Sequence, residues 1–250
     1  MIERSKTVMN DLVAAIRNVM LKHEITNEEL RFAVKYLKET ANTEFELELM
    51  MENFFEITTA HVTNNKNSGS ASNIAGPFFL EDAPDIGSEG EIKTLEEGEH
   101  LPIVIRGQIK DLAGKPISGV KLDVWHSTPR GTYSGVHEGI PSEYYRAKLT
   151  TDEMGYYKVR TTKPVPYQIP DNGNTGRLLK SMGRHAWRPA HVHFKARKPG
   201  LQEHITQVYF NGEDYVDSDC CEAVIDELVI PFVEENGEQV IIKNFVLDAA

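Results

Sequence analysis

The stretch Pro164–Phe194, PVPYQIPDNGNTGRLLKSMGRHAWRPAHVHF, closes on two histidines, His191 and His193, with one valine between them. Residues i and i+2 of a strand point to the same side, whereas in a helix they diverge. Val192 and the Phe194 that follows favour a strand. The pair can therefore present two imidazoles to one point, as a metal site requires. An HxH pair alone is a weak signal, so its surroundings decide its meaning.

Short apolar segments separated by turns lie on both sides of this stretch. Repeated short strands joined by long loops favour a β-sandwich, and we expect an antiparallel one over residues 101–250. The expected strands are 103–107, 120–125, 155–161, 191–196, 205–210 and 239–247.

Residues 1–64 show helical periodicity instead. Thr26 and Glu29 form a capping-box signature at the start of a second helix, and a third helix is expected from about Thr43. The first helix has an apolar stripe of Val8, Leu12, Ile16 and Val19, the second has Leu30, Val34 and Leu37, and the third has expected core contacts at Phe45, Leu49, Phe54 and Ile57.

The stripes of the helical region allow two interpretations, packing within the subunit or a dimer interface. Residues 65–100 contain scattered proline and glycine with little periodicity, which indicates a linker and a long loop. The chain is therefore expected to comprise a helical region 1–64, a linker and loop 65–100, and a β-sandwich 101–250.

The 250 residues carry a formal net charge of −11, with 40% hydrophobic and 26% charged residues. This is the composition of a soluble globular protein, and the acidic balance argues against nucleic acid as a partner. No apolar run approaches transmembrane length, and the first residues are unlike a signal peptide. The only cysteines, Cys220 and Cys221, are neighbours that rarely form an unstrained disulfide. We expect a reducing, cytoplasmic setting.

Two tyrosines lie in turn-rich settings, Tyr133 in the run PRGTYSG and Tyr167 between the prolines of PVPYQIP. A tyrosine in a turn is usually packed by its ring with its hydroxyl in water. A phenolate is costly because the unperturbed pKa is about 10, but a bound trivalent cation can remove that proton. Two phenolates and two neutral imidazoles would suit the hard ion Fe(III). The spacing leaves both interpretations open.

Long motifs surround these residues. The runs WHSTPRGTYSG (125–135), IPSEYYRAKLTTD (140–152), GRHAWRPAHVHFKARKPG (183–200) and DSDCCEAV (217–224) together resemble the intradiol ring-cleaving dioxygenases. The resemblance covers almost the whole chain, including the helical N-terminus and the GPFF segment at 76–79. Within the family, the chain is most similar to the chlorocatechol 1,2-dioxygenase branch.

The resemblance implies an oxidoreductase of aromatic-compound catabolism that uses one non-haem Fe(III) per subunit. The reaction would be intradiol cleavage of a catechol or chlorocatechol with O2 to a cis,cis-muconate, with the metal acting as Lewis acid and template. The ligands implied by the matching motifs are Tyr133, Tyr167, His191 and His193.

Three positions match catalytic residues of the family. The second tyrosine ligand leaves the iron when the catechol binds and helps to take up a substrate proton, and Tyr167 matches that role. Arg188 matches the arginine beside the iron, where a cation stabilises developing anionic oxygens. Gln207 matches the glutamine on the neighbouring strand that orients the active-site groups.

The resemblance implies that the substrate pocket is formed by positions on the third helix, by the loop that covers the ring, and by Cys221 on the opposite side. Glu52 and Asn53 depart from the chlorocatechol pattern, in which we expect an aspartate and a small or β-branched apolar residue. A larger acid and an amide near the ring could favour a ring with a further polar substituent. The pocket positions are Leu49, Glu52, Asn53, Ile74, Gly76, Pro77, Phe78 and Cys221.

The alternatives differ in chemistry. A hydroxyquinol 1,2-dioxygenase would use the same iron site, and the departures at Glu52 and Asn53 keep it open. A transthyretin-like β-sandwich without catalysis would leave the HxH pair to chance, and a zinc hydrolase would require carboxylate, cysteine or further histidine ligands. The resemblance also implies a homodimer formed through the N-terminal helices, with a channel there that holds phospholipid or fatty-acid tails.

Overall fold

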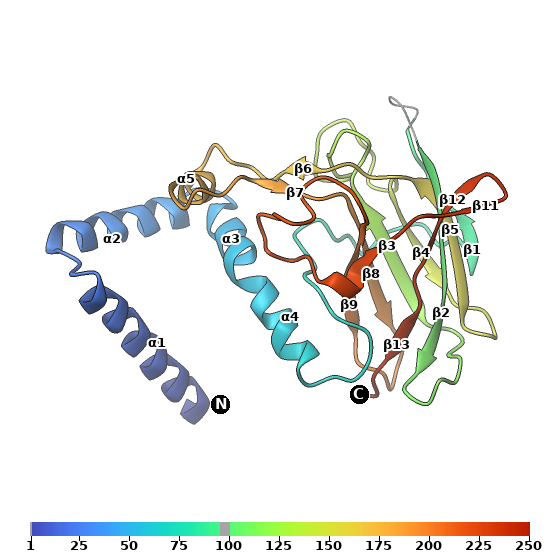
Figure 1. Ribbon diagram of the computed structural model, residues 1–250, viewed down its shortest axis with the longest axis horizontal. Helices are drawn as coiled ribbons and strands as arrows, with labels where there is room; N and C mark the ends of the chain where they lie inside the picture. The colour runs from blue at the N-terminus through green and yellow to red at the C-terminus, as the bar shows by residue number, and fades with distance from the viewer. Residues whose placement is uncertain (1, 96–100) are drawn as a thin grey trace. The chain divides into compact units, whose positions relative to one another are not determined.

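The computed structural model describes residues 2–95 and 101–250 (Figure 1). The chain divides into two compact units, Met1–Leu47 and Glu48–Ala250. Among the helices of these described ranges, none combines the length and the apolar content that a membrane span requires.

The first unit contains helices α1 (Ile2–Lys22) and α2 (Asn27–Asn42). The predicted capping box is confirmed, because the Thr26 hydroxyl accepts from the Glu29 amide at 3.2 Å and the Glu29 carboxylate accepts from the Thr26 amide at 2.8 Å. The apolar stripe of α1 lies in solvent, with exposed fractions from 50% at Leu12 to 56% at Val19.

The third helical stretch has three parts, α3 (Glu46–Met51), the π-helix η1 (Glu52–Glu56) and α4 (Ile57–Asn64). The expected core contact at Phe45 is wrong. Phe45 precedes the helix with a φ of 63°, and its side chain is 73% exposed. The left-handed turn directs this residue away from the packed side of the helix. Ile57 is buried, as expected.

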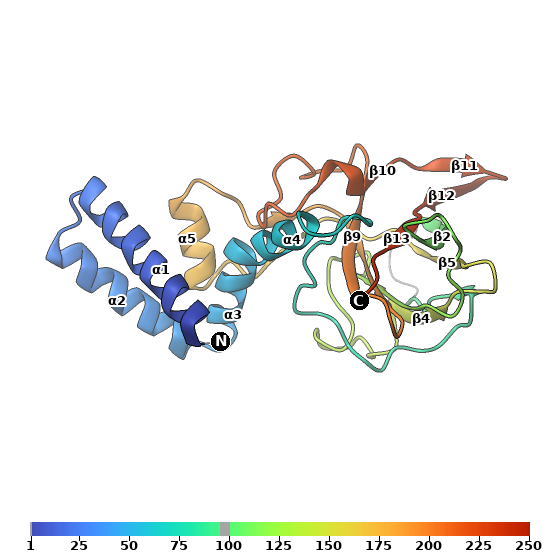
Figure 2. The same cartoon turned by 90° about the horizontal axis from the view of Figure 1, so that it is seen from below.

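The second unit contains two main sheets and one short ribbon, in addition to its helices (Figure 1). One sheet has the order β1-β5-β2-β12-β11, with β13 also paired to β2, and the other has the order β10-β9-β8-β3-β4. The β11 and β12 strands form a hairpin at the edge of the first sheet (Figure 2). The bounds are β1 (Glu89–Glu91), β2 (Pro102–Asp111), β3 (Lys121–His126), β4 (Arg146–Thr150), β5 (Tyr156–Thr162), β6 (Tyr167–Gln168), α5 (Asn174–Ser181), β7 (Trp187–Arg188), β8 (His191–Arg197), β9 (His204–Phe210), η2 (Asp226–Leu228), β10 (Val229–Ile230), β11 (Val233–Glu235), β12 (Glu238–Ile242) and β13 (Phe245–Leu247).

The predicted sandwich is confirmed, but the sheets are mixed rather than antiparallel throughout. β12 and β13 both run parallel to β2, β1 runs parallel to β5, and β10 runs parallel to β9. Parallel neighbours need a long connection between them. The β2 and β12 strands meet that condition, because most of the sandwich lies between them in sequence.

One apolar core lies between the two sheets. Strand residues that point inward alternate with less buried ones, as along β2, where Ile105, Gly107 and Ile109 are buried and the residues between them are half-buried. Completely buried contributors are Ile105 and Val159 from the first sheet and Val124, Phe194 and Val208 from the second. This core fixes β8 between β3 and β9, at the centre of its sheet.

The predicted linker and loop are held by specific hydrogen bonds. The Asp248 carboxylate accepts from the amides of Ser68 and Gly69, both at 3.0 Å. A Cβ on Gly69 would lie 2.4 Å from the Val246 carbonyl oxygen, a backbone atom that cannot easily move, so this close approach requires glycine. The backbone N–H of Asn73 donates to the carbonyl of Ile205 in β9 at 2.8 Å. This bond positions the segment that follows Asn73. The part of this region at 96–100 lies outside the described residues.

The buried His204 predicts a loss of stability in acid. Burial and the nearby Lys243 cation lower the pKa of His204 to about 4, although Asp248 opposes the shift. Unfolding restores a pKa of about 6.5, so the unfolded state binds a proton first as the pH falls. The contribution of neutral His204 to the free energy of unfolding is complete above about pH 6.5. About 2 kcal/mol of this contribution should be lost by pH 5.0.

The measurement is the free energy of unfolding in urea at pH 7.5 and pH 5.0. His204→Gln should make the loss between the two pH values about 2 kcal/mol smaller than in the wild type. His61→Gln, which removes an exposed histidine, is the control and should keep the wild-type loss. The same loss in His204→Gln as in the wild type would contradict the expectation.

Candidate metal centre

Strand β8 presents His191 and His193 on one face, as predicted. Each residue is 1% exposed, and their Nε2 atoms lie 3.1 Å apart. The indole of Trp125, from the neighbouring β3, stacks on the His193 ring with centroids 4.6 Å apart and an interplanar angle of 7°. Strand pairing and stacking therefore fix both imidazoles toward one point.

The structure brings the two predicted tyrosines to the same point. The Tyr133 hydroxyl lies 3.4 Å from the Nε2 atom of each histidine. Tyr167, the first residue of β6, has its ring 5.5 Å from that of Tyr133 and 5.7 Å from that of His191. The two phenol groups are close enough for each to affect the pKa of the other. All four residues are buried.

The protonation of these groups tests whether they fit a metal. His191 donates from Nδ1 to the Pro189 carbonyl at 2.7 Å, so its Nε2 carries the lone pair. Burial, and the positive charge of Arg188, lower the pKa of both His191 and His193, which keeps the rings neutral. Two neutral imidazole nitrogens and two phenol oxygens that converge in this way form a suitable ligand set for a hard cation.

The phenol groups point to the same conclusion. Burial raises the pKa of Tyr133 well above its usual value, and burial also raises the pKa of Tyr167. Both therefore remain phenols unless a cation is bound nearby, which would stabilise the phenolate. The residues fit a trivalent metal better than they fit a site without one.

Arg188, predicted as a catalytic residue, lies against the histidines with its charge buried. Its guanidinium approaches His191 Nε2 at 3.3 Å and donates to Gln207 Oε1 at 2.9 Å. Burial alone would lower the pKa of Arg188, but Asp219, whose carboxylate accepts two hydrogen bonds at 3.2 Å, holds it well above its usual value. The predicted Gln207 is thus also at the site.

Two residues of this cluster were not predicted. Asp219 neutralises Arg188, and the Tyr209 hydroxyl donates to Gln207 Oε1 at 2.7 Å. Asp219 belongs to the DSDCCEAV motif, and Tyr209 lies two residues beyond Gln207, on the same face of β9. The motif around Asp219 and the two-residue spacing between Gln207 and Tyr209 could therefore have identified both residues from the sequence.

The predicted pocket loop lies directly over the histidines. Gln207 Nε2 donates to the Ile74 carbonyl at 2.9 Å, and the Phe78 ring stacks on Tyr133 at 4.3 Å. A Cβ on Gly76, which has a φ of 66°, would lie 3.6 Å from the His193 ring. Pro77 is exposed.

The predicted helix wall begins at Leu49, which packs against the same apolar cluster as Tyr167. The π-helix η1 was not predicted. It contains Glu52, whose pKa is raised to about 7 by burial and by the charges of Glu56 and Glu48. Such π-turns often occur at functional sites because they change the direction of side chains within a helix.

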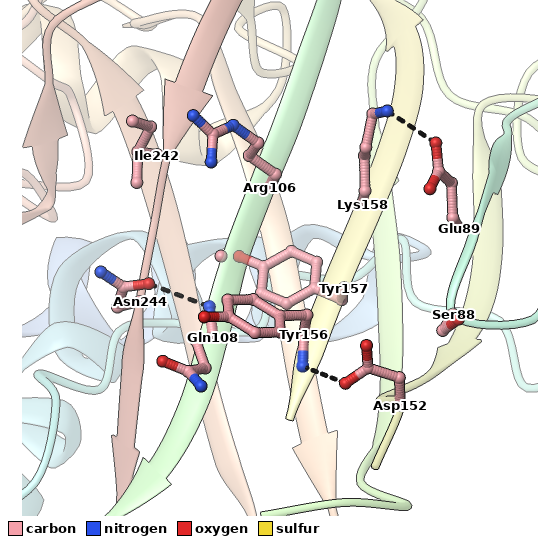
Figure 3. Close-up of a pocket in the computed structure, with 11 residues that line it drawn as sticks. Ser88, Glu89, Arg106, Gln108, Asp152, Tyr156, Tyr157, Lys158, Ile242 and Asn244 are labelled. Atoms are coloured by element: carbon pink, nitrogen blue, oxygen red, sulfur yellow. Dashed lines mark hydrogen bonds and ion pairs between the residues drawn. The ribbon is translucent and has the colours of Figure 1, made fainter. Parts of the chain in front are cut away.

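A surface pocket of about 420 Å³ lies elsewhere, on β2 and β5 (Figure 3). Its two cations already have carboxylate partners, Lys158 with Glu89 at 2.6 Å and Arg106 with Glu235 at 2.7 Å. None of the predicted site residues lines it. The predicted site residues are therefore separate from this pocket.

The Arg188–Asp219 pair gives a prediction about stability. The two side chains are 3% and 1% exposed, so Asp219→Asn would leave a buried cation without its counter-ion. The free energy of unfolding in urea should fall by about 3–5 kcal/mol. Glu89→Gln, the same change of carboxylate to amide in an exposed ion pair, should cost about 1 kcal/mol or less. Equal losses in the two variants would contradict the assignment.

Comparison with known proteins agrees with this geometry. A protein-family model described as Dioxygenase matches residues 74–249. Chlorocatechol 1,2-dioxygenase from Pseudomonas putida is 46% identical over 246 residues, which are 98% of this chain and 94% of that protein. A chlorocatechol 1,2-dioxygenase from Pseudomonas sp. strain P51 is 46% identical over 248 residues, or 99% of this chain and 98% of that protein. The crystal structure of the Pseudomonas putida protein superposes with a TM-score of 0.94 at 46% identity, covering 99% of this chain and 100% of that one. This chain belongs to the intradiol ring-cleavage dioxygenase family.

Proposed function

We propose that this chain cleaves catechol or a chlorinated catechol between its two hydroxyl-bearing carbons, with O2, to give a cis,cis-muconate. The observation that carries the proposal is the convergence of His191 Nε2, His193 Nε2 and the Tyr133 hydroxyl within 3.4 Å of one another. The relatives named as chlorocatechol 1,2-dioxygenases support the substrate class.

Intradiol dioxygenases are known to use non-haem iron, and the four converging residues have suitable donors for Fe(III). We assign one ion per subunit to Tyr133, Tyr167, His191 and His193. Bound Fe(III) would act as a Lewis acid that polarises the catecholate toward reaction with O2 and as a template for both reactants.

The residues around the ion have separate roles in the proposal. With the ion bound, Tyr167 would be held as a phenolate, and its Oη would accept a proton from a substrate hydroxyl, because burial raises the pKa of Tyr167 and so favours the protonated phenol. The Arg188 guanidinium stabilises the negative charge that develops on the substrate oxygens. Gln207 holds Arg188 in place through the hydrogen bond at 2.9 Å. Phe78 and Trp125 cover the ligands with aromatic rings and so exclude water.

The helical region has a different role. We assign residues 1–64 to dimer formation and to the binding of lipid tails, because the α1 stripe of Val8, Leu12, Ile16 and Val19 is apolar and exposed. We assign 65–100 to the linker and the loop over the substrate, and 101–250 to the catalytic sandwich. A cytoplasmic location stays a prediction, supported by two free thiols.

The first test is the visible spectrum of the iron-loaded protein, before and after anaerobic addition of catechol. A phenolate-to-Fe(III) absorption band should be present and should shift when catechol binds, and admission of air should yield a cis,cis-muconate. Tyr133→Phe should remove most of the band and lower kcat/KM for catechol at least about 100-fold.

Tyr157→Phe is the matched control for this test. It removes another buried tyrosine hydroxyl, which donates to the Lys243 carbonyl at 2.7 Å, away from the histidines. The band and kcat/KM should be retained, with a loss of about 1 kcal/mol in the free energy of unfolding. A protein that stays colourless after iron loading, or a Tyr133→Phe variant with an unchanged spectrum, would refute the ligand assignment.

A further inference from the structure

Arg146 is a second buried cation near the candidate metal centre. It is the first residue of β4 and is 2% exposed. Its guanidinium donates to three neutral oxygens: the Ser134 hydroxyl at 2.8 Å, the Ser134 carbonyl at 2.7 Å and the Phe78 carbonyl at 3.1 Å. These bonds use all three nitrogens of the guanidinium, but none of them neutralises its charge.

The charge of Arg146 is compensated differently from that of Arg188. Burial lowers the pKa of Arg146 to about 10, and among the described residues Tyr133 is the one group whose charge opposes this shift. Arg188, in contrast, has the carboxylate of Asp219. A buried cation is stabilised most by an anion that is also buried, because the local dielectric constant is low. As a phenolate ligand of the proposed ion, Tyr133 would be that anion.

The hydrogen bonds of Arg146 also hold the Tyr133 ring on two sides. Ser134 follows Tyr133 in the chain, so the two bonds to Ser134 fix the turn that carries the phenol. Phe78, whose carbonyl accepts the third bond, stacks on the Tyr133 ring with centroids 4.3 Å apart and an interplanar angle of 24°. One side chain thus joins the turn that contains Tyr133 to the loop that covers it.

Strand pairing fixes the position of Arg146 relative to the histidines. Arg146 is the cross-strand partner of Trp125 on β3, and the Trp125 indole stacks on His193. The positive charge of Arg146 contributes to the lowered pKa of His193 and opposes the effect of burial on the pKa of Tyr133. The cation is therefore close enough to act on two of the candidate ligands.

We propose that Arg146 is a positioning residue for the metal ligand Tyr133: its hydrogen bonds hold Tyr133 and Phe78 together, and its charge complements the ligand's phenolate. The inference rests on the proposed function, because the phenolate requires the proposed Fe(III). It goes beyond that function by giving a role to a buried cation that belongs to neither the ligands nor the predicted catalytic residues.

The absorption band of the iron-loaded protein reports on the Arg146 charge. A positive charge near the phenolate lowers the energy of the electrons that the band transfers to Fe(III), so removal of that charge should move the band to longer wavelength. Arg146→Gln keeps an N–H donor without the charge, and its band should shift by on the order of 10 nm. Arg146→Lys keeps the charge without the planar fork of donors, and its band should stay closer to the wild-type position.

The two substitutions separate charge from packing. Both disrupt the paired bonds to Ser134, so a role in packing alone would move both bands equally. Equal shifts, or an unshifted band in Arg146→Gln, would overturn the proposal. Arg160→Gln is the control, because it makes the same change at a partly exposed arginine that pairs with Glu238 on the other sheet. Its band should stay at the wild-type position.

Ser134→Ala tests the positioning without a change of charge, and it decides that role if Arg146→Gln does not fold. It removes one acceptor of the guanidinium, so the turn should hold the Tyr133 ring less firmly. The kcat for catechol should fall about threefold to tenfold, and the band should stay at the wild-type wavelength. An unchanged kcat would overturn the positioning role.

The wild-type spectrum separates this inference from the function on which it rests. A wild-type protein without a phenolate-to-Fe(III) band would refute the iron assignment, and the role of Arg146 with it. A wild-type band that responds equally to Arg146→Gln and Arg146→Lys would refute only the role of Arg146.

Discussion

The buried positive charge of Arg188 constrains the whole candidate site. A guanidinium that is 3% exposed is tolerated only if its charge is neutralised and its N–H groups are hydrogen-bonded. Asp219 supplies the charge from a loop, and Gln207 supplies an acceptor from β9. Gln207 also bonds the Ile74 carbonyl, so the loop over the histidines depends on the same network. The position of one cation thus connects segments that are far apart in the sequence.

This network also prepares the histidines for a metal. Burial, together with the positive charge of Arg188, lowers the pKa of His191 and His193, which keeps both rings neutral and leaves their lone pairs available. In the proposed iron site the ligands would come from a central strand and from rings fixed by stacking, so little ordering would remain when the ion binds. Burial disfavours free phenolates, and the same burial would strengthen their attraction to a trivalent ion.

Local patterns in the sequence predicted the features that depend on neighbouring residues. The two-residue period of a strand placed His191 and His193 on one face, and Thr26 with Glu29 gave the helix cap. The convergence of Tyr133 with the histidines required the family motifs, because it is a long-range contact. The parallel pairing of β12 with β2 could not be predicted, since nothing in either strand specifies its neighbour. Phe45 was predicted wrongly because periodicity does not reveal a left-handed turn at a helix start.

The π-helix η1 contains buried polar groups that lower the stability of the fold. Asn53 Nδ2 and Glu56 Oε2 are both buried without hydrogen-bond partners. In the same segment, burial raises the pKa of Glu52 to about 7. An apolar helix surface would avoid these costs, as the sandwich core does. Conflicts between local chemistry and stability are expected where a protein meets its ligand. Asn53 contacts Cys221, which belongs to the same buried cluster as Tyr133 and Tyr167, so this unmet polar group lies beside the candidate site rather than in the core of the sandwich.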